Sequence, residues 1–241
     1  MSEKQLSLPE VRSKLDDADK LIFFTGAGIS AESGVPTYRG AGGIWGSYNY
    51  EEYACQDAFL RNPEAVWSFH NYRRELVAAC APNEGHRIIA QIEQERPCTV
   101  ITQNIDGLHH AAGSKNILEL HGSLWRVRCQ TTGEKHVDLA VPFAARRDDG
   151  LWWRPDIIWF GDALDERVVD SAMQAAVQAD VFISIGTSAS VFPAAHLPVY
   201  AQQAGAFLIE INPEETPLSH VYHHLMRMSA SDALGALFNG T

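Results

Sequence analysis

The chain has 241 residues, of which 46% are hydrophobic and 20% charged, a balance typical of one globular domain with a substantial core. Lys and Arg number 19 against 30 Asp and Glu, and the formal net charge of −11 argues against a nucleic-acid-binding protein. No apolar run approaches the roughly 20 residues of a membrane span, and the polar N-terminal segment lacks a secretion signal, so we expect a cytoplasmic protein with no membrane partner.

Short apolar runs, rich in Val, Ile and Phe, alternate with helical patterns along the chain. Such runs are typical of buried strands, which are predicted at residues 20–25, 98–102, 117–120, 157–160, 181–186 and 206–212. Helices are predicted over residues 63–80, 83–95 and 165–179. Strands that alternate with helices predict an α/β fold with a mostly parallel sheet covered on both faces, in which ligands bind beyond the carboxyl ends of the strands.

The first predicted strand leads into the sequence TGAGISAESGVPTYRG, from Thr25 to Gly40. Its GAG turn, Gly26 to Gly28, ends a strand, where glycine backbone can approach a pyrophosphate closely. The spacing is not that of the GxGxxG dinucleotide fingerprint, so a purely structural turn stays open at this point. Arg39, in the same loop, is placed either to clamp a phosphate or to form a surface ion pair.

Two stretches fit the predicted sheet poorly. Residues 39–81 combine a Gly-rich loop with a helix, and residues 124–155 have the composition of a loop, with the charged turn ARRDDG at 145–150. We expect these two stretches to fold together as a small subdomain.

Polar residues stand at the carboxyl ends of the later strands. Gln103, Asn104 and Asp106 follow the second strand and can bond a ribose or an amide, although Asn104 or Asp106 would equally serve as a helix N-cap. His121 ends the third strand, where an imidazole is either a general base or a structural group. The last two strands end at residues 186–188 and at Asn212, which suit a phosphate and a ribose.

Together these sequences resemble the sirtuin family of NAD-dependent protein lysine deacylases. The matching strings are GAGISAESGVPTYRG, TQNIDGLH, HG at 121–122, WFG at 159–161, GTS at 186–188 and IN at 211–212, in family order and over nearly the whole chain. The resemblance implies a Rossmann-like NAD-binding domain with a small inserted subdomain. Their expected bounds are 1–38, 82–122 and 156–241 for the former, and 39–81 plus 123–155 for the latter.

The resemblance also implies roles for individual residues. The implied catalytic residues are His121, Asn104 and Asp106, with His121 as the base that deprotonates a ribose hydroxyl after the acyl oxygen has displaced nicotinamide. The residues implied to lie beside a substrate peptide, which would add as a strand, are Ile158, Phe160, Gly161 and Val191. The implied NAD-binding residues are Gly26, Ala27, Gly28, Arg39, Gln103, Asn104, Ile105, Asp106, Gly186, Thr187, Ser188, Asn212 and Ala230.

The expected acyl pocket is most similar to that of the bacterial and mitochondrial desuccinylase-type sirtuins. Ala41 leaves room for a longer acyl chain, and Arg73 matches the arginine that grips a distal carboxylate in that class. The tyrosine of the class's Tyr-x-x-Arg pair is replaced by His70, which can still donate a hydrogen bond to a carboxylate. The alternative for His70 and Arg73 is an ordinary exposed helix face.

The cysteine pattern departs from the family. Sirtuins usually carry two CxxC-type pairs that hold a structural zinc, and here only Cys129 stands near the expected place, with Thr132 three residues on. Because structural zinc needs four Cys or His ligands, we expect no bound metal. We expect Arg154 and the pair at 152–153, both tryptophans, to pack in its place. The other cysteines are Cys55, Cys80 and Cys98, and no disulfide is expected.

These inferences predict an NAD-dependent protein lysine deacylase that removes succinyl and acetyl groups. Its partners would be acylated proteins or peptides, and a monomer is the simplest state. An ADP-ribosyltransferase or NAD hydrolase on the same scaffold is the alternative, because either would cleave NAD without needing His121 as a base.

Overall fold

The structure is a computed structural model that describes residues 6–37, 43–44 and 48–239. Within these residues, six parallel strands form a sheet in the order β3-β2-β1-β7-β8-β9. The strands are β1 (Leu21–Thr25), β2 (Cys98–Thr102), β3 (Ile117–Glu119), β7 (Val181–Ile185), β8 (Phe207–Ile211) and β9 (His224–Met226). The α/β fold with a mostly parallel sheet is thereby confirmed.

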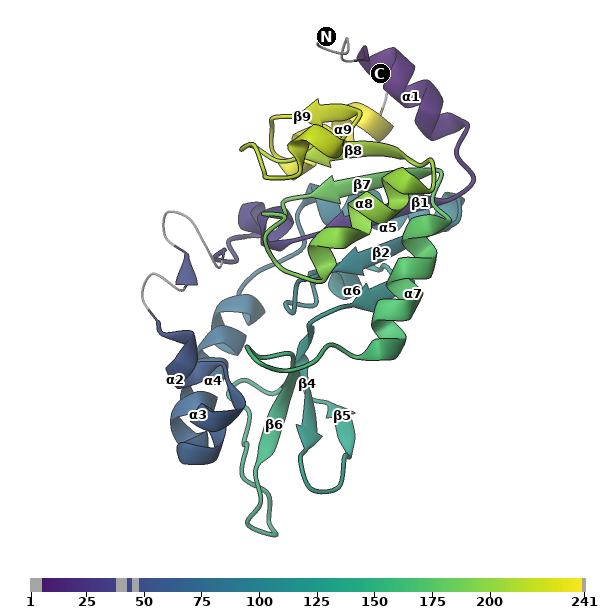
Figure 1. Ribbon diagram of the computed structural model, residues 1–241. Coiled ribbons are helices and arrows are strands. Elements are labelled where there is room, and N and C mark those ends of the chain that lie inside the picture. The colour runs from purple at the N-terminus through teal and green to yellow at the C-terminus, as the bar shows by residue number, and fades with distance from the viewer. Residues whose placement is uncertain (1–5, 38–42, 45–47, 240–241) are drawn as a thin grey trace.

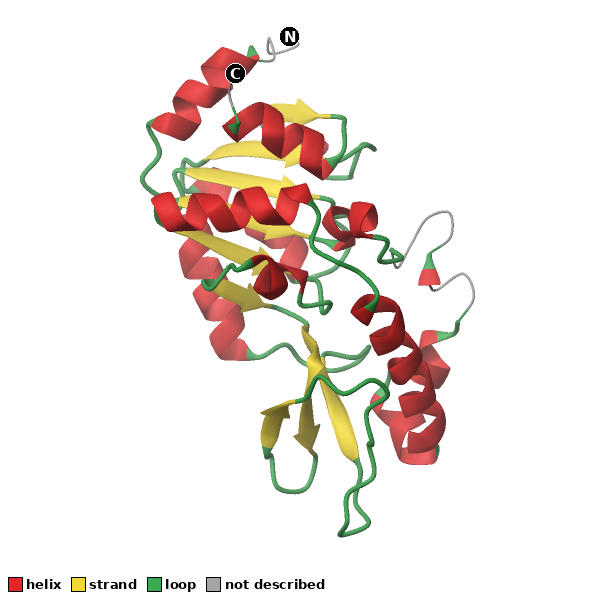
Figure 2. Cartoon of the chain, turned by 180° about the vertical axis from the view of Figure 1, so that it is seen from behind, coloured by secondary structure: helices red, strands yellow, loops and turns green. Residues whose placement is uncertain are grey.

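Helices cover both faces of this sheet (Figures 1 and 2). One face packs against α1 (Leu8–Asp16), α5 (Glu84–Glu95) and α9 (Ala230–Phe238), and the other against α7 (Glu166–Val177) and α8 (Leu197–Gln203). Along β1, Leu21 and Phe23 point to the first group of helices, while Ile22 and Phe24 point to the second. This alternation explains why β1 is apolar throughout: a strand covered on both faces has no solvent side.

A second lobe lies at the β3 edge of the sheet, away from the chain termini (Figure 1). It combines α2 (Tyr50–Tyr53), α3 (Gln56–Arg61) and α4 (Pro63–Ala78) with an antiparallel sheet of order β5-β4-β6. The strands of this sheet are β4 (Gly122–Cys129), β5 (Lys135–Val137) and β6 (Trp153–Ile157). Its core is separate from that of the large lobe and is centred on Trp67, Leu124, Val127, Phe143 and Trp159.

The antiparallel sheet corrects two predictions. The loop expected over 124–155 contains three strands, and the strand expected at 157–160 lies earlier, as β6. Charged and aromatic residues such as Arg126, Arg128 and Arg154 fill these strands, so no apolar run marks them. Their pairing depends on partners far along the chain.

Four shorter elements complete the described chain. They are α6 (Leu108–Ala112) and the 3-10 turns η1 (Ala27–Ser33), η3 (Ala194–His196) and η4 (Ser219–Val221). Gly122 carries the chain from the large lobe into β4 at a φ of 78°, and a Cβ atom there would lie 2.0 Å from the Asp156 carbonyl oxygen, so only glycine fits. None of the described helices is both long and apolar enough to cross a membrane.

Candidate active site

Two glycine turns interlock at the carboxyl edge of the parallel sheet. The N–H of Gly28 donates to the carbonyl oxygen of Gly186 at 2.9 Å. A Cβ atom on Gly28 would lie 2.6 Å from the Gly186 Cα, and one on Gly26 would lie 2.7 Å from the Gly186 oxygen. Gly186 itself has a φ of 60°. These turns therefore require glycine, and their bare backbone offers a phosphate the close approach that a side chain would block.

The segment after β2 is fixed by bonds to the first glycine turn. The Asn104 side-chain amide donates to the Gly26 carbonyl oxygen at 3.0 Å, and the Ser30 hydroxyl donates to Asp106 Oδ2 at 2.8 Å. Both Asn104 and Asp106 are buried. The second Asp106 oxygen accepts from the Leu108 N–H at 2.9 Å. The N-cap of α6 is Gly107, so neither Asn104 nor Asp106 is the N-cap that the sequence allowed.

Asp106 occupies an environment that disfavours its charge. Burial raises the pKa of the Asp106 carboxyl, while hydrogen bonds from Leu108 and Ser30 and the nearby Arg73 oppose that rise. Trp125 Nε1 donates to the Asp106 carbonyl oxygen at 2.6 Å and closes the segment from the side of the small lobe. The Asn104–Asp106 segment is therefore a rigid, largely dry wall.

His121 has the tautomer that a general base needs. Its Nδ1 lies 2.9 Å from the Gln103 carbonyl oxygen. A carbonyl only accepts, so Nδ1 carries the proton and the Nε2 lone pair is left to accept another. Burial lowers the pKa of His121 below its ordinary 6.5, and the bond to Gln103 partly opposes that shift. The imidazole is therefore neutral near pH 7.

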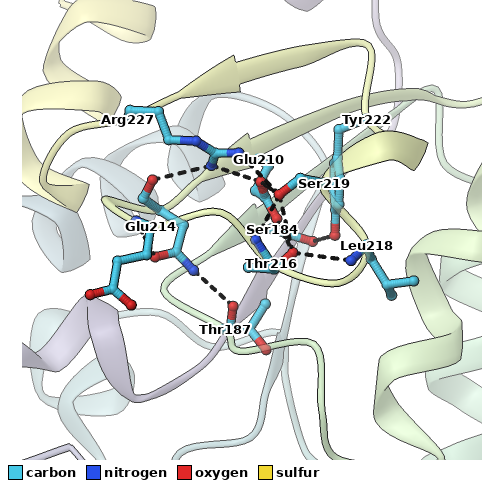
Figure 3. Close-up of polar contacts among 10 residues, drawn as sticks. Ser184, Thr187, Glu210, Glu214, Thr216, Leu218, Ser219, Tyr222 and Arg227 are labelled. Carbon is cyan, nitrogen blue, oxygen red and sulfur yellow. Dashed lines mark hydrogen bonds and ion pairs between the residues drawn. The ribbon is translucent and has the colours of Figure 1, made fainter. Parts of the chain in front are cut away.

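Side-chain bonds connect His121 to the far end of the sheet. Gln103 Nε2 donates to the Thr187 hydroxyl at 2.9 Å, and Asn212 Nδ2 donates to the Thr187 carbonyl oxygen at 2.9 Å (Figure 3). These contacts bring together residues that the sequence analysis selected at four separate strand ends. The edge presents amide, hydroxyl and bare backbone groups, a donor and acceptor set that suits the amide, riboses and phosphates of NAD.

A buried carboxylate organises the loop that follows β8 (Figure 3). Glu210 is 2% exposed and accepts from the Thr216 and Ser219 hydroxyls at 2.6 Å each and from Arg227 Nη1 at 2.7 Å. Arg227 also donates to the Asn212 carbonyl oxygen at 3.2 Å. The Glu210 carboxylate therefore connects the loop after Asn212 to Arg227, and through Arg227 to Asn212 itself.

Arg73 lines a small pocket beside this wall. The pocket is formed by Ala27, Ser30, Val35, Pro36, Arg73, Asn104, Ile105 and Asp106. The Arg73 side chain is 3% exposed, so the alternative of an exposed helix face does not hold for it. The structure thus brings the predicted acyl-chain residue together with the predicted catalytic segment.

His70 is not among the residues that line this pocket. Its ring is stacked on Trp159, with centroids 5.8 Å apart, and is 3% exposed. Neither ring nitrogen makes a hydrogen bond of normal geometry within the described residues, although the Tyr53 backbone lies close by. Burial and the charge of Arg73 lower the pKa of His70 to about 3, so its ring is neutral.

Two of the remaining predicted site residues fall outside the described residues, Arg39 and Ala41. The Ile158 N–H donates to the His121 carbonyl oxygen at 3.0 Å. Phe160 is 46% exposed, and its backbone forms a parallel bridge with Cys55, in which its N–H donates to the Ala54 carbonyl oxygen at 3.1 Å. The other members of the set are Gly161, Val191, Ser188 and Ala230, the last at the start of α9.

The residues near Cys129 do not fit a zinc ion. Within residues 6–37, 43–44 and 48–239, no group of three or more His, Cys, Asp or Glu side chains is arranged to hold a metal. Hydrogen bonds from Thr132 lower the pKa of the Cys129 thiol. Arg147 lies 4.4 Å above the Trp153 ring, and Arg154 lies 3.8 Å above the Trp159 ring. The expected packing of Arg154 thus involves Trp159.

Sequence reasoning missed three polar residues that shape the site. Ser30 and Glu210 lie inside apolar or small-residue runs, and Arg74 follows Arg73 without any motif of its own. Ser30 stands in the matched sequence GAGISAESGVPTYRG, which was the one signal available for it.

Comparisons with known proteins agree with this geometry. A family model described as "Sir2 family" matches residues 26–193. The chain is 44% identical over 225 residues to NAD-dependent protein deacylase 1 of Caldanaerobacter subterraneus subsp. tengcongensis, covering 91% of this chain and 93% of that protein. It is 43% identical over 225 residues to the NAD-dependent protein deacylase of Aquifex aeolicus, covering 91% and 94% of the two.

Solved structures show the same similarity. A mutant Sir2 homologue in complex with ADP-ribose superposes with a TM-score of 0.91 at 40% identity, covering 95% of this chain and 94% of that one. A Sir2 homologue in complex with NAD gives a TM-score of 0.90 at 39% identity, covering 98% and 94%.

Proposed function

Because the chain belongs to the Sir2 family and is an NAD-dependent protein lysine deacylase, we propose that it prefers lysines carrying a short, negatively charged acyl group such as succinyl, and that it also accepts acetyl. The observation that carries the proposal is the position of Arg73. Its buried guanidinium lines the same pocket as Asn104 and Asp106. A cation held there can pair with a distal carboxylate, and such charge-assisted bonds are roughly twice as strong as neutral ones.

Each site residue has a proposed task in the deacylation. NAD, when bound, would supply a ribose carbon whose leaving group is the cationic nicotinamide. The acyl oxygen can bond to that carbon as nicotinamide leaves. The buried Asn104–Asp106 wall keeps water away from that carbon. His121 Nε2 accepts a ribose hydroxyl proton, while the Gln103 carbonyl oxygen accepts from the other ring nitrogen, Nδ1, and keeps the ring oriented.

His70 has a different proposed role from Arg73. A neutral ring stacked on Trp159 gives no ionic contribution to carboxylate binding, because the His70 pKa of about 3 keeps it unprotonated at working pH. We propose that His70 fixes α4 against the segment that follows β6 and that Arg73 alone supplies the charge for the distal carboxylate.

The test compares acyl groups on one peptide. The protein is incubated with NAD and matched acetyl-, succinyl- and longer neutral acyl-lysine peptides, and free lysine peptide and nicotinamide are quantified. Arg73→Ala should lower kcat/KM for the succinyl peptide about tenfold or more beyond its effect on the acetyl peptide, because one charge-assisted pair is lost. Arg61→Ala, an exposed arginine on α3, is the matched control.

Equal losses for both peptides in Arg73→Ala would refute the charged-acyl proposal. His121→Ala should abolish both reactions in a protein that remains folded, since it removes the base. NAD consumption that needs no peptide would instead support the hydrolase alternative. A cytoplasmic location, a monomeric state, the NAD-binding roles of individual residues and the lack of zinc stay predictions.

A further inference from the structure

The helix that carries Arg73 also carries the most deeply buried arginine of the described chain. Arg74 is fully buried, and its guanidinium donates to three backbone carbonyl groups of the small lobe. Nη1 bonds the Leu124 oxygen at 2.5 Å, and Nη2 bonds the Asp138 and Ala140 oxygens at 2.6 and 2.9 Å. Nε adds a second bond to Ala140 at 3.2 Å.

Aromatic rings and one carboxylate complete the surroundings of this cation. The Arg74 guanidinium carbon lies 4.9 Å from the Trp125 ring centroid and 5.4 Å from that of Phe143. Asp138 Oδ1 lies 3.4 Å from Nη2. Burial lowers the pKa of Arg74, and Asp138 opposes that shift. A desolvated guanidinium is costly, so it is stable only where carbonyls and ring faces replace water on all sides.

These contacts join three segments of the small lobe. Leu124 belongs to β4, Asp138 and Ala140 follow β5, and Arg74 belongs to α4. Asn71, one turn earlier on α4, exchanges two bonds with Phe143, at 2.9 and 3.1 Å. The polar contacts of Arg74 therefore fix α4 against both segments.

We propose that Arg74, through the rigidity it gives α4, positions Arg73 for the acyl carboxylate. The inference rests on the proposed charged-acyl function. Arg73 and Arg74 are neighbours on α4, so the three carbonyl groups that hold Arg74 also fix the rotation of the helix and the position of Arg73. Arg74 is a positioning residue and does not itself reach the pocket lined by Arg73.

Lysine is the informative replacement for Arg74. Arg74→Lys keeps the charge but cannot hold three carbonyls in a planar fork. We expect kcat/KM for the succinyl peptide to fall about tenfold beyond any loss for the acetyl peptide, chiefly through KM for the peptide, with KM for NAD unchanged. Arg147→Lys, in the same lobe and stacked on Trp153, is the control and should leave the ratio unchanged.

A second variant covers the case in which Arg74→Lys does not fold. Asn71→Leu removes the neighbouring tie to Phe143 and should shift the succinyl-to-acetyl ratio in the same direction, by less.

Parallel losses of both activities in a folded Arg74→Lys or Asn71→Leu would overturn the inference. The outcome is distinguishable from failure of the proposed function, because that failure appears in Arg73→Ala. If Arg73→Ala selectively loses desuccinylation while Arg74→Lys does not, the charged-acyl proposal stands and the positioning role of Arg74 is wrong.

Discussion

The two lobes hold their buried polar groups in different ways. At the carboxyl edge of the parallel sheet, Gln103 bonds Thr187 and Asn104 bonds the Gly26 carbonyl oxygen, all as neutral groups, and the buried Glu210 carboxylate pairs with a partly exposed Arg227. In the small lobe, two cations are among the most deeply buried groups, Arg74 and Arg154, which are 0% and 3% exposed.

The difference has an energetic consequence. Neutral hydrogen bonds contribute modestly and can be replaced by water where an edge opens to a ligand. A buried cation that loses its partners leaves an uncompensated charge or an unpaired acid, which costs several times more. The small lobe should therefore be sensitive to single arginine changes, and the sheet edge should respond mainly in ligand affinity.

Arg154→Met tests whether the small lobe is sensitive to a single arginine change, and it has the largest expected effect. Arg154 pairs with Asp162, donates to Gln56 Oε1 at 2.6 Å and covers Trp159. Its removal leaves Asp162 without its main cation, and the free energy of unfolding in urea should fall by about 3 kcal/mol.

Arg147→Met is the control for that experiment. Its guanidinium also lies over a tryptophan, but its ion pairs with Glu134 and Asp149 are at the surface. The change in unfolding free energy should be much smaller. A similar loss in both variants would contradict the idea that buried cations, rather than arginine–tryptophan stacking in general, support this lobe.

Glu210→Gln tests the sheet edge and should have a smaller effect. Glutamine keeps the volume, but its amide cannot accept from Arg227 and both hydroxyls at once. The loop carrying Asn212 should loosen, so KM for NAD rises several-fold, within the 1–3 kcal/mol or so of one unsatisfied group, while kcat is retained. Glu215→Gln, exposed in the same loop, is the control. A fall in kcat with unchanged KM would show that Glu210 does not act through NAD binding.

The sequence could predict the parallel sheet because its strands are covered on both faces. Residues 98–102 form a continuous apolar run for that reason, and the predicted and observed strands coincide. Strand ends then located Asn104, Asp106 and His121, since the carboxyl ends of parallel strands meet at one edge. The small sheet could not be predicted, because its charged strands are buried only after pairing with distant segments.

Two of the site residues that were missed have partners far along the chain. Ser30 bonds the Asp106 carboxylate, 76 positions away, and Arg74 bonds the carbonyls of Leu124 and Ala140. A backbone carbonyl carries no sequence signature, so the partners of Arg74 cannot be assigned from residue types. Motif resemblance compensates for this at Ser30, but not at Arg74.

The pH dependence of the reaction gives the smallest expected effect and tests His121 as a buried, neutral base. Below its pKa, His121 carries a proton on Nε2 and cannot accept the ribose hydroxyl proton, so the rate falls on the acid side. Burial lowers that pKa, and the acid limb of kcat/KM should therefore lie below pH 6.5. Circular dichroism at each pH separates this limb from acid unfolding. An acid limb above pH 6.5 in folded protein would mean that a nearby negative charge stabilises the imidazolium, so that burial does not control the protonation of His121.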